Sequence, residues 1–398
     1  MLKGKTVVVG VTGGIAIFKA CSVVSSLTKM GANVKVIMTE AAKEFVSPLT
    51  FRTLSKNPVY DNMFSSPERW EVEHVELAKA ADLIVVCPAT ANTIAKFAHG
   101  IADNPLTTTV LASKAKKLIF PAMNVGMYEN EATVENIATL KKRGFIVFEP
   151  NEGYLACGDT AKGRMAEPEE IIWEIEKELA FEKDLLGKTV LVTAGPTMES
   201  IDPVRFITNH SSGKMGVAIA KAAYLRGADV ILVSGKTNLS CPAGIKKIDV
   251  VSAEDMYNAV NDNKAKADII IKAAAVADFT PETKADNKIK KNGKTEMTIS
   301  LTGTKDILKS LGESKKEGTV LVGFCMETEN LIENAKRKLD NKNLDMIVAN
   351  NLNDKGAGFG VDTNTVTILT RDGKEYTPEN MEKEKLSHII LDLAKERL

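Results

Sequence analysis

Short runs of β-branched and aliphatic residues recur along this chain, and each leads through a turn into a stretch with helical periodicity. In the first half these runs predict strands at Thr6–Val9, Val34–Met38, Leu83–Cys87, Leu118–Phe120 and Phe145–Phe148. In the second half they predict strands at Val190–Thr193, Val230–Val233, Ile269–Ile271, Val320–Val322 and Met346–Val348. Strands that alternate with helices in this way favour parallel sheets covered on both faces, so the pattern predicts an α/β protein.

The hydrophobic pattern restarts in the middle of the chain. Residues 2–9, LKGKTVVV, are similar to residues 185–192, LLGKTVLV, and each run leads through a helix to a Gly-Ala-x-Val step and another strand. A helix predicted from Pro168 to about Glu182 closes the first unit, because proline suits the first helical turn. We therefore expect two tandem doubly wound, Rossmann-like domains, residues 1–184 and 185–398.

Composition narrows the class of protein. The chain has 398 residues, of which 44% are hydrophobic, and this length is too great for one ordinary core. Its 52 basic residues equal its 52 acidic ones, so we expect neither a nucleic-acid nor a membrane partner. Five cysteines without CxxC spacing fit reduced thiols, and we find no signal-peptide pattern or bilayer-length apolar run. These features predict a cytoplasmic protein.

The segment 209–216, NHSSGKMG, lies between the strand that begins at Val190 and a helix predicted at Val217–Arg226. Hydroxyl groups, exposed amides and a lysine thus meet at a helix N-terminus, which attracts anions. The spacing of a Walker loop is absent, so a phosphate or nucleotide site and a solvated turn both remain open for this segment.

Small and polar residues follow the predicted strands of the first half. The segments GGIA at 13–16, CPATAN at 87–92 and PAMN at 121–124 come where strands end, which is where open α/β sheets bind ligands. The pattern predicts a site for a flat cofactor ring and its phosphate at this edge.

Longer motifs in both halves carry a family resemblance. In the first half, HVELAKAADLIVVCPATANTIAKFAHGIAD, PAMN and LACGD with GRM resemble the flavin-dependent phosphopantothenoylcysteine decarboxylases. In the second half, TAGPT, IDPVRFITNHSSGKMG, AAAVADFTP, KIKK and VGFCMETEN resemble phosphopantothenate-cysteine ligase. Joined in this order, the halves are similar to the bifunctional coenzyme A biosynthesis family of bacteria and archaea. Met198 and Ala161 depart from the family pattern, which often has arginine and glycine there.

The resemblance implies that the first half is a flavodoxin-like FMN domain that decarboxylates 4′-phosphopantothenoylcysteine. It assigns His74 as a base, Asn124 as a donor to the substrate carboxylate and Cys157 as the acid that protonates the enethiolate when the flavin returns its hydride. Polar helix starts and buried thiols are common structural features, so the residues alone leave these roles open. The FMN contacts implied are Gly13, Gly14, Ile15, Thr39, Pro88, Ala89, Thr90, Asn92, Asp103 and Met123.

For the second half the resemblance implies a ligase domain with a parallel central sheet that joins 4′-phosphopantothenate to cysteine. CTP with Mg²⁺ would supply an acyl-cytidylate intermediate, although the residues do not identify the metal ligands. Asn209 is implied to assist amide formation and Lys288 to hold charge on the nucleotide. The nucleotide contacts implied are Ser212, Gly213, Lys272, Ala273, Ala274, Asp278, Lys288, Lys305, Asp306, Ile307, Leu308, Phe324, Lys338 and Lys342.

The family also implies a homo-oligomer, with trimeric decarboxylase units and dimeric ligase units combined into a dodecamer.

Three other functions remain as alternatives to the bifunctional enzyme. A nicotinamide-dependent dehydrogenase is disfavoured, because Thr39 and Gly235 stand where an acidic ribose ligand would follow the second strand. A non-catalytic flavoprotein regulatory subunit fits the fold but not the set of reactive residues. A flavoprotein decarboxylase for another cysteine substrate leaves the second half unexplained.

Overall fold

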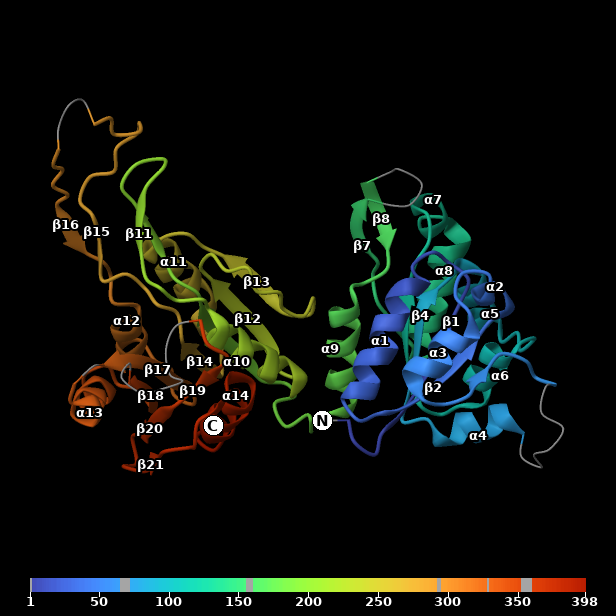
Figure 1. Cartoon of the computed structure of the whole chain (residues 1–398). Coiled ribbons are helices and arrows are strands. Elements are labelled where there is room, and N and C mark those ends of the chain that lie inside the picture. The colour runs from blue at the N-terminus through green and yellow to red at the C-terminus, as the bar shows by residue number, and fades with distance from the viewer. Residues whose placement is uncertain (1, 65–71, 155–159, 292–294, 328, 352–359) are drawn as a thin grey trace. The chain divides into compact units, whose positions relative to one another are not determined.

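The computed structural model describes residues 2–64, 72–154, 160–291, 295–327, 329–351 and 360–398. The chain divides into two compact units, Met1–Phe181 and Glu182–Leu398. Each unit has its own central sheet with helices on both sides (Figure 1).

The first unit contains a six-stranded sheet in the order β3-β2-β1-β4-β5-β6. Every strand pairs in parallel with its neighbour, and the central β1 pairs with both β2 and β4. The central strands are buried on both sides, which explains their nearly continuous apolar sequences. The strands are β1 Thr6–Val11, β2 Asn33–Met38, β3 Val59–Tyr60, β4 Leu83–Ala89, β5 Lys116–Pro121 and β6 Ile146–Val147.

Two hydrophobic clusters lie on the two faces of this sheet, one under α1 and α9 and the other under α5, α6 and α8. Alternate strand residues supply each cluster, with Val7 and Val9 on one face and Val8 on the other. A β-hairpin follows β6, with strands β7 Asn151–Tyr154 and β8 Thr160–Arg164. The helices are α1 Ile17–Lys29, α2 Glu40–Lys43, α3 Pro48–Ser55, α4 Glu73–Ala80, α5 Ala91–His99, α6 Pro105–Ala112, α7 Val125–Tyr128, α8 Glu131–Lys142 and α9 Pro168–Leu179.

The second unit contains an eight-stranded sheet in the order β13-β12-β9-β14-β17-β18-β20-β21. The first six strands run parallel, whereas β20 and β21 add antiparallel pairs at one edge. The strands are β9 Thr189–Ala194, β12 Asp229–Ser234, β13 Lys246–Asp249, β14 Ile269–Lys272, β17 Val320–Glu327, β18 Met346–Asn351, β20 Val366–Thr370 and β21 Glu375–Tyr376.

Helices again cover both faces of this sheet. Residues of α10 and α14 belong to one apolar cluster, and residues of α11, α12 and α13 belong to the opposite one. The helices are α10 Lys214–Leu225, α11 Ala253–Asn263, α12 Ile307–Glu313, α13 Leu331–Asn341 and α14 Lys383–Lys395, with a 3₁₀ turn at Lys264–Lys266. Three short antiparallel pairs lie outside the sheet: β10 Met198–Ser200 with β11 Phe206–Thr208, β15 Phe279–Pro281 with β16 Leu301–Gly303, and β19 Thr363–Asn364 with β22 Met381–Glu382.

The ten strands predicted from hydrophobic runs are all confirmed, with ends that differ from the prediction by at most five residues. Two helix predictions are confirmed with shifted ends, because α9 ends at Leu179 and α10 spans Lys214–Leu225. The hairpins and the antiparallel edge strands were not predicted, since their segments are too short or too polar to show a clear period.

Candidate functional site

Three loops meet at the carboxyl edge of the first sheet. A Cβ on Gly13 would lie 2.6 Å from the Cβ of Ala41, so the loop after β1 touches α2, the helix that follows β2. The hydroxyl of Thr12 donates to the carbonyl of Pro88 at 2.8 Å and accepts from the amide of Thr90 at 3.1 Å, which holds the loop after β4 beside them. Thr12 is a residue that the sequence analysis missed.

The carboxyl edge of the first sheet has features that suit a bound cofactor. The Oγ1 atom of Thr39 is buried and has no hydrogen-bond partner among the described residues. An unpaired buried hydroxyl is costly, so it fits a donor or acceptor on a ligand. Gly13 and Gly14 have no side chains, so the backbone after β1 is open to a ligand. Pro88 and Ala89 are buried at the end of β4. Ile15 and Asn92 are exposed at the same edge, and Met123 is half-buried.

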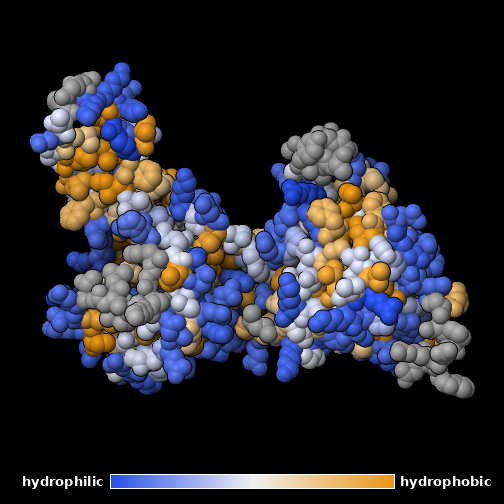
Figure 2. Space-filling model, viewed as in Figure 1, coloured by the Kyte–Doolittle hydropathy of each residue, from blue (hydrophilic) through white to orange (hydrophobic). Residues whose placement is uncertain are grey.

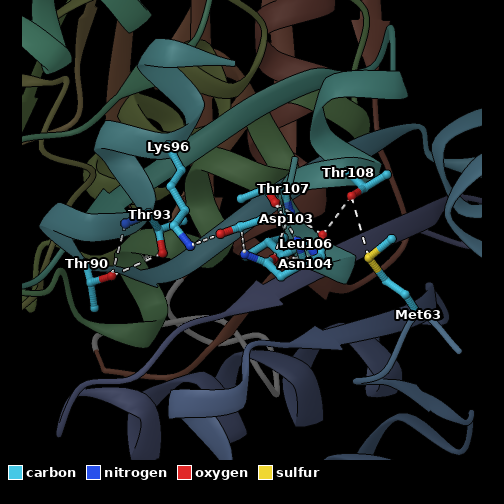
Figure 3. A network of polar contacts seen from close by, with 9 residues as sticks. All are labelled: Met63, Thr90, Thr93, Lys96, Asp103, Asn104, Leu106, Thr107 and Thr108. Atoms are coloured by element: carbon cyan, nitrogen blue, oxygen red, sulfur yellow. Dashed lines mark hydrogen bonds and ion pairs between the residues drawn. The ribbon is translucent and has the colours of Figure 1, made fainter. Parts of the chain in front are cut away.

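Asp103 belongs to a polar network at the start of α6 (Figure 3). Its carboxylate accepts from Lys96 at 2.6 Å and from Asn104 at 2.9 Å, and the Lys96 hydrogen bond holds the pKa of Asp103 below its usual range. A Cβ on Gly10 would lie 2.4 Å from the side chain of Leu106, so α6 begins against the carboxyl end of β1.

The structure places His74 and Asn124, two of the three predicted decarboxylation residues, apart in one copy of the unit. His74 is half-buried in the first turn of α4, whereas Asn124 is exposed and caps α7 by accepting from Gly126 at 2.8 Å. Figure 1 places α4 and α7 at opposite ends of the unit. Cys157 lies outside the described residues, between β7 and β8.

A cavity of about 440 Å³ opens at the carboxyl edge of the second sheet. Most of the predicted nucleotide contacts line it, together with the predicted catalytic Asn209. These are Ser212, Gly213, Lys272, Ala273, Ala274, Asp278, Leu308, Phe324, Lys338 and Lys342.

The N-terminus of α10 forms one wall of this cavity. Gly213 adopts a φ of +78° at the N-cap, and no side chain caps the helix, so its first amides remain available to an anion. A Cβ on Gly216 would lie 2.7 Å from the carbonyl oxygen of Thr193, so α10 packs directly on β9. Nearby, the Asn209 amide donates to the carbonyl of Ala275 at 3.1 Å.

Three lysines form the opposite wall. Burial lowers the pKa of Lys272 to about 8, and the neighbouring Lys342 ammonium adds to that lowering. Lys342 forms an ion pair with Asp306 at 2.9 Å, and Lys338 lies one turn earlier on α13. This wall would balance the negative charge of several phosphates.

Four predicted contacts lie outside the described lining of the cavity. Lys288 is exposed in the loop after β15, and Lys305 pairs instead with Glu254 at 2.7 Å. Ile307 is buried in the core under α12, and Asp306 acts as the N-cap of that helix. Asp306 still reaches the site through its ion pair with Lys342.

Several lining residues were missed by the sequence analysis. Lys214 is not one of these, since the sequence analysis placed this lysine of segment 209–216 at the helix N-terminus, whereas Asn350 follows the last predicted strand and had a local signal. Asn364 and Lys383 come from short or polar segments that no pattern marked, and only folding brings them to the cavity.

No group of three or more potential metal ligands occurs among the residues that the structure describes. In the same part of the chain, no helix is both long and apolar enough to cross a membrane.

Two α/β units, one with a cofactor-like edge and one with an anion-binding cavity, define this chain as a two-domain nucleotide- or cofactor-dependent enzyme. Residues 1–180 match the model of the flavoprotein family, and residues 185–398 match the model described as the DNA/pantothenate metabolism flavoprotein C-terminal domain. The chain belongs to the family of bifunctional coenzyme A biosynthesis proteins.

The similarity extends over whole relatives. The coenzyme A biosynthesis bifunctional protein of Bacillus subtilis is 52% identical over 394 residues, which cover 98% of this chain and 97% of that protein. The corresponding protein of Escherichia coli K12 is 42% identical over 393 residues, with the same shares covered. A crystal structure of the C-terminal domain of such a protein is 42% identical, has a TM-score of 0.47 and covers 54% of this chain and 97% of its own.

Proposed function

We propose that the second unit joins 4′-phosphopantothenate to cysteine at the expense of CTP, and that the first unit decarboxylates the product to 4′-phosphopantetheine. The two activities are those of the family, phosphopantothenate-cysteine ligase and phosphopantothenoylcysteine decarboxylase. The observation that carries the proposal is the cavity, which combines an uncapped helix N-terminus, three lysines and Asn209. We assign residues 1–184 to the decarboxylase and 185–398 to the ligase.

The ligase reaction has two steps. A carboxylate oxygen of the substrate attacks the α-phosphorus of CTP and pyrophosphate leaves, which forms the acyl-cytidylate. The amine of cysteine then attacks the acyl carbon, CMP leaves, and the amine loses a proton. Lys272, Lys338 and Lys342 suit the first step, because their charges balance the triphosphate and the leaving pyrophosphate.

Asn209 suits the second step. Its Nδ2 already donates to Ala275, and its second N–H remains available to the oxygen that gains charge as the amine attacks. Lys288 is exposed after β15 and lies outside the described lining of the cavity, so we propose that it reaches a nucleotide only when a second copy presents it.

Mg²⁺ would accompany the nucleotide. Magnesium commonly binds through substrate phosphates with one or two carboxylates, and Asp278 in the cavity wall with Asp306 beside Lys342 could supply these. Such a site needs no dedicated cluster of protein ligands.

In the first unit, FMN when bound would oxidise and later reduce the substrate carbon that carries the thiol. The orphaned hydroxyl of Thr39 and the bare backbone at Gly13 and Gly14 suit its phosphate and ring. Asn124 would hold the substrate carboxylate and His74 would remove a proton. Because α4 and α7 lie far apart, we propose that a second copy of the unit supplies one of these two residues (Figure 1).

Exposed apolar side chains support a homo-oligomer. The two hairpins that project from the second unit carry Val204, Phe206, Phe279 and Leu301, which are 46 to 57% exposed. Figure 2 shows apolar surface gathered there and on the first unit as well. Surfaces of this kind usually mark interfaces, in agreement with paired ligase units and trimeric decarboxylase units.

The full chain, incubated with 4′-phosphopantothenate, cysteine, CTP and Mg²⁺, tests the proposal. We expect pyrophosphate and CO₂ in equal amounts and 4′-phosphopantetheine by mass spectrometry. If pyrophosphate forms without CO₂, the decarboxylase assignment is wrong. If neither forms while FMN is bound, the ligase assignment is wrong.

A further inference from the structure

Three polar residues of the cavity lining, Asn350, Asn364 and Lys383, are not among the proposed nucleotide contacts. Lys338 and Lys342 belong to the face of the sheet covered by α12 and α13. Asn350, Asn364 and Lys383 line the same cavity at the ends of β18, β19 and α14, and α14 covers the opposite face. The cavity therefore has two polar sides, and the second side, which the N-terminus of α10 shares, carries three residues that the proposed nucleotide contacts leave unused.

Asn350 carries an unpaired acceptor on this second side. The residue is only 9% exposed, and its Nδ2 donates to Oδ1 of Asn364 at 3.3 Å. That Asn364 oxygen also accepts from the backbone amide of Thr365 at 3.1 Å, which fixes which amide atom of each side chain is the oxygen. The Oδ1 atom of Asn350 is buried and has no partner among the described residues. Such an atom fits an N–H or O–H group of a ligand.

Lys383 is a buried cation on the same side. It is 7% exposed, and its Nζ donates to the carbonyl of Val361. Within the described ranges no carboxylate lies within ion-pair distance of it, whereas the nearby Lys214 pairs with Asp362 at 2.7 Å. Burial, reinforced by the Lys214 charge, lowers the pKa of Lys383. The Asp362 carboxylate, which is already paired with Lys214, only partly opposes this lowering. A buried ammonium is costly, and an anion bound beside Lys383 would reduce that cost.

Together, the ammonium of Lys383 and the amide oxygen of Asn350 are complementary to the carboxylate and the amino group of an α-amino acid. We propose that Asn350 and Lys383 form the subsite for the incoming cysteine, with Lys383 binding its carboxylate and Asn350 Oδ1 accepting from its amino group. This proposal rests on the proposed ligase function. An amide suits the amino group better than a carboxylate would, because a carboxylate stabilises the protonated amine, which cannot attack. A phosphate suits the pair less well, since it would face the lone pairs of the Asn350 oxygen.

The first test separates the two steps of the ligase in the full chain. Asn350→Leu keeps the side chain branched at Cγ, and Asn364 keeps its bond to Thr365, so we expect the fold and its thermal unfolding midpoint to be largely retained. We expect the KM for cysteine to rise roughly tenfold or more, the change typical for a lost hydrogen bond to a charged or reacting group. Pyrophosphate release in the first turnover without cysteine should stay unchanged, as should the KM values for CTP and 4′-phosphopantothenate.

The second test uses cysteamine, which has the amine and the thiol of cysteine but no carboxylate. Lys383→Met should raise the KM for cysteine toward that for cysteamine and leave the KM for cysteamine unchanged, and Lys383→Arg should restore part of the loss. Lys385→Met is the matched control, because Lys385 is an exposed lysine on the same helix. It should change neither value.

Measurements on the unmodified chain and on the variants distinguish a wrong cysteine subsite from a wrong ligase assignment. If the unmodified chain releases no pyrophosphate, the proposed function is wrong. If the unmodified chain is active but Asn350→Leu slows pyrophosphate release without cysteine, or raises only the KM for 4′-phosphopantothenate, then this side of the cavity binds the acyl donor and the cysteine subsite is wrong. Equal effects of Lys383→Met on cysteine and cysteamine would also overturn it.

Discussion

At the scale of single residues, a substitution of Asn209 separates formation of the acyl-cytidylate from its conversion to the amide. We expect Asn209→Ala to release pyrophosphate in the first turnover but to accumulate acyl-cytidylate in the presence of cysteine. Loss of one oxyanion donor costs about 3 kcal/mol, or roughly a hundredfold in rate, which makes the intermediate visible by mass spectrometry after quenching. His210→Ala is the control, since His210 is exposed and outside the described cavity lining. Rapid conversion to amide by the Asn209 variant would leave only a structural role.

The lowered pKa of Lys272 predicts that nucleotide binding depends on pH. Its pKa of about 8 lies below the usual lysine range because of burial, so the free enzyme loses this charge as the pH rises through 8. Bound phosphates favour the ammonium form, and binding of CTP at pH 8.5 should therefore take up protons and weaken with rising pH. Calorimetry in buffers of different ionisation enthalpy measures this uptake. Lys272→Met should abolish it and Lys305→Met should not, and identical heats in all buffers for the unmodified chain would contradict the prediction.

At the scale of elements, the contact between α10 and β9 sets the shape of the ligase cavity. A Cβ on Gly216 would lie 2.7 Å from both the Ala194 Cβ and the Thr193 carbonyl oxygen, and backbone atoms cannot move aside easily. Gly216→Ala should thus lower the free energy of unfolding by about 1–3 kcal/mol and weaken CTP binding. Gly303→Ala is the control, because nothing lies within 4 Å of the added atom. Chemical denaturation of the full chain compares them, and equal stabilities would show that α10 can shift.

At the scale of the whole molecule, separation of α4 from α7 predicts decarboxylase sites shared between copies. His74→Ala and Asn124→Ala should each abolish CO₂ release from 4′-phosphopantothenoylcysteine. If the two residues of one site come from different copies, then mixing the variants, with dissociation and reassembly, should restore part of the activity. Each variant reassembled alone is the control. No recovery in mixtures that are shown to contain both chains would place His74 and Asn124 in the same copy.

The sequence predicted the strands well because each central strand is buried on both faces and must be apolar throughout. Val7, Val8 and Val9 show this, since adjacent residues enter opposite clusters. The family resemblance also implied most of the residues that line the cavity of the second unit, among them Ser212, Gly213 and Lys272, because its motifs are contiguous in the sequence. The hairpin strands β10 and β11 escaped prediction because three residues are too few to show a period.

What the sequence determined by itself is the pair of α/β units, the family and the loops that carry the chemistry, since hydrophobic period and contiguous motifs are local properties. Only the tertiary structure decided that Asn350 and Lys383 share a cavity with Lys272, because these residues are far apart in sequence and each meets the cavity at the end of a different element. The structure also separated His74 from Asn124. Proximity across a sheet edge depends on strand order, and no local pattern encodes strand order.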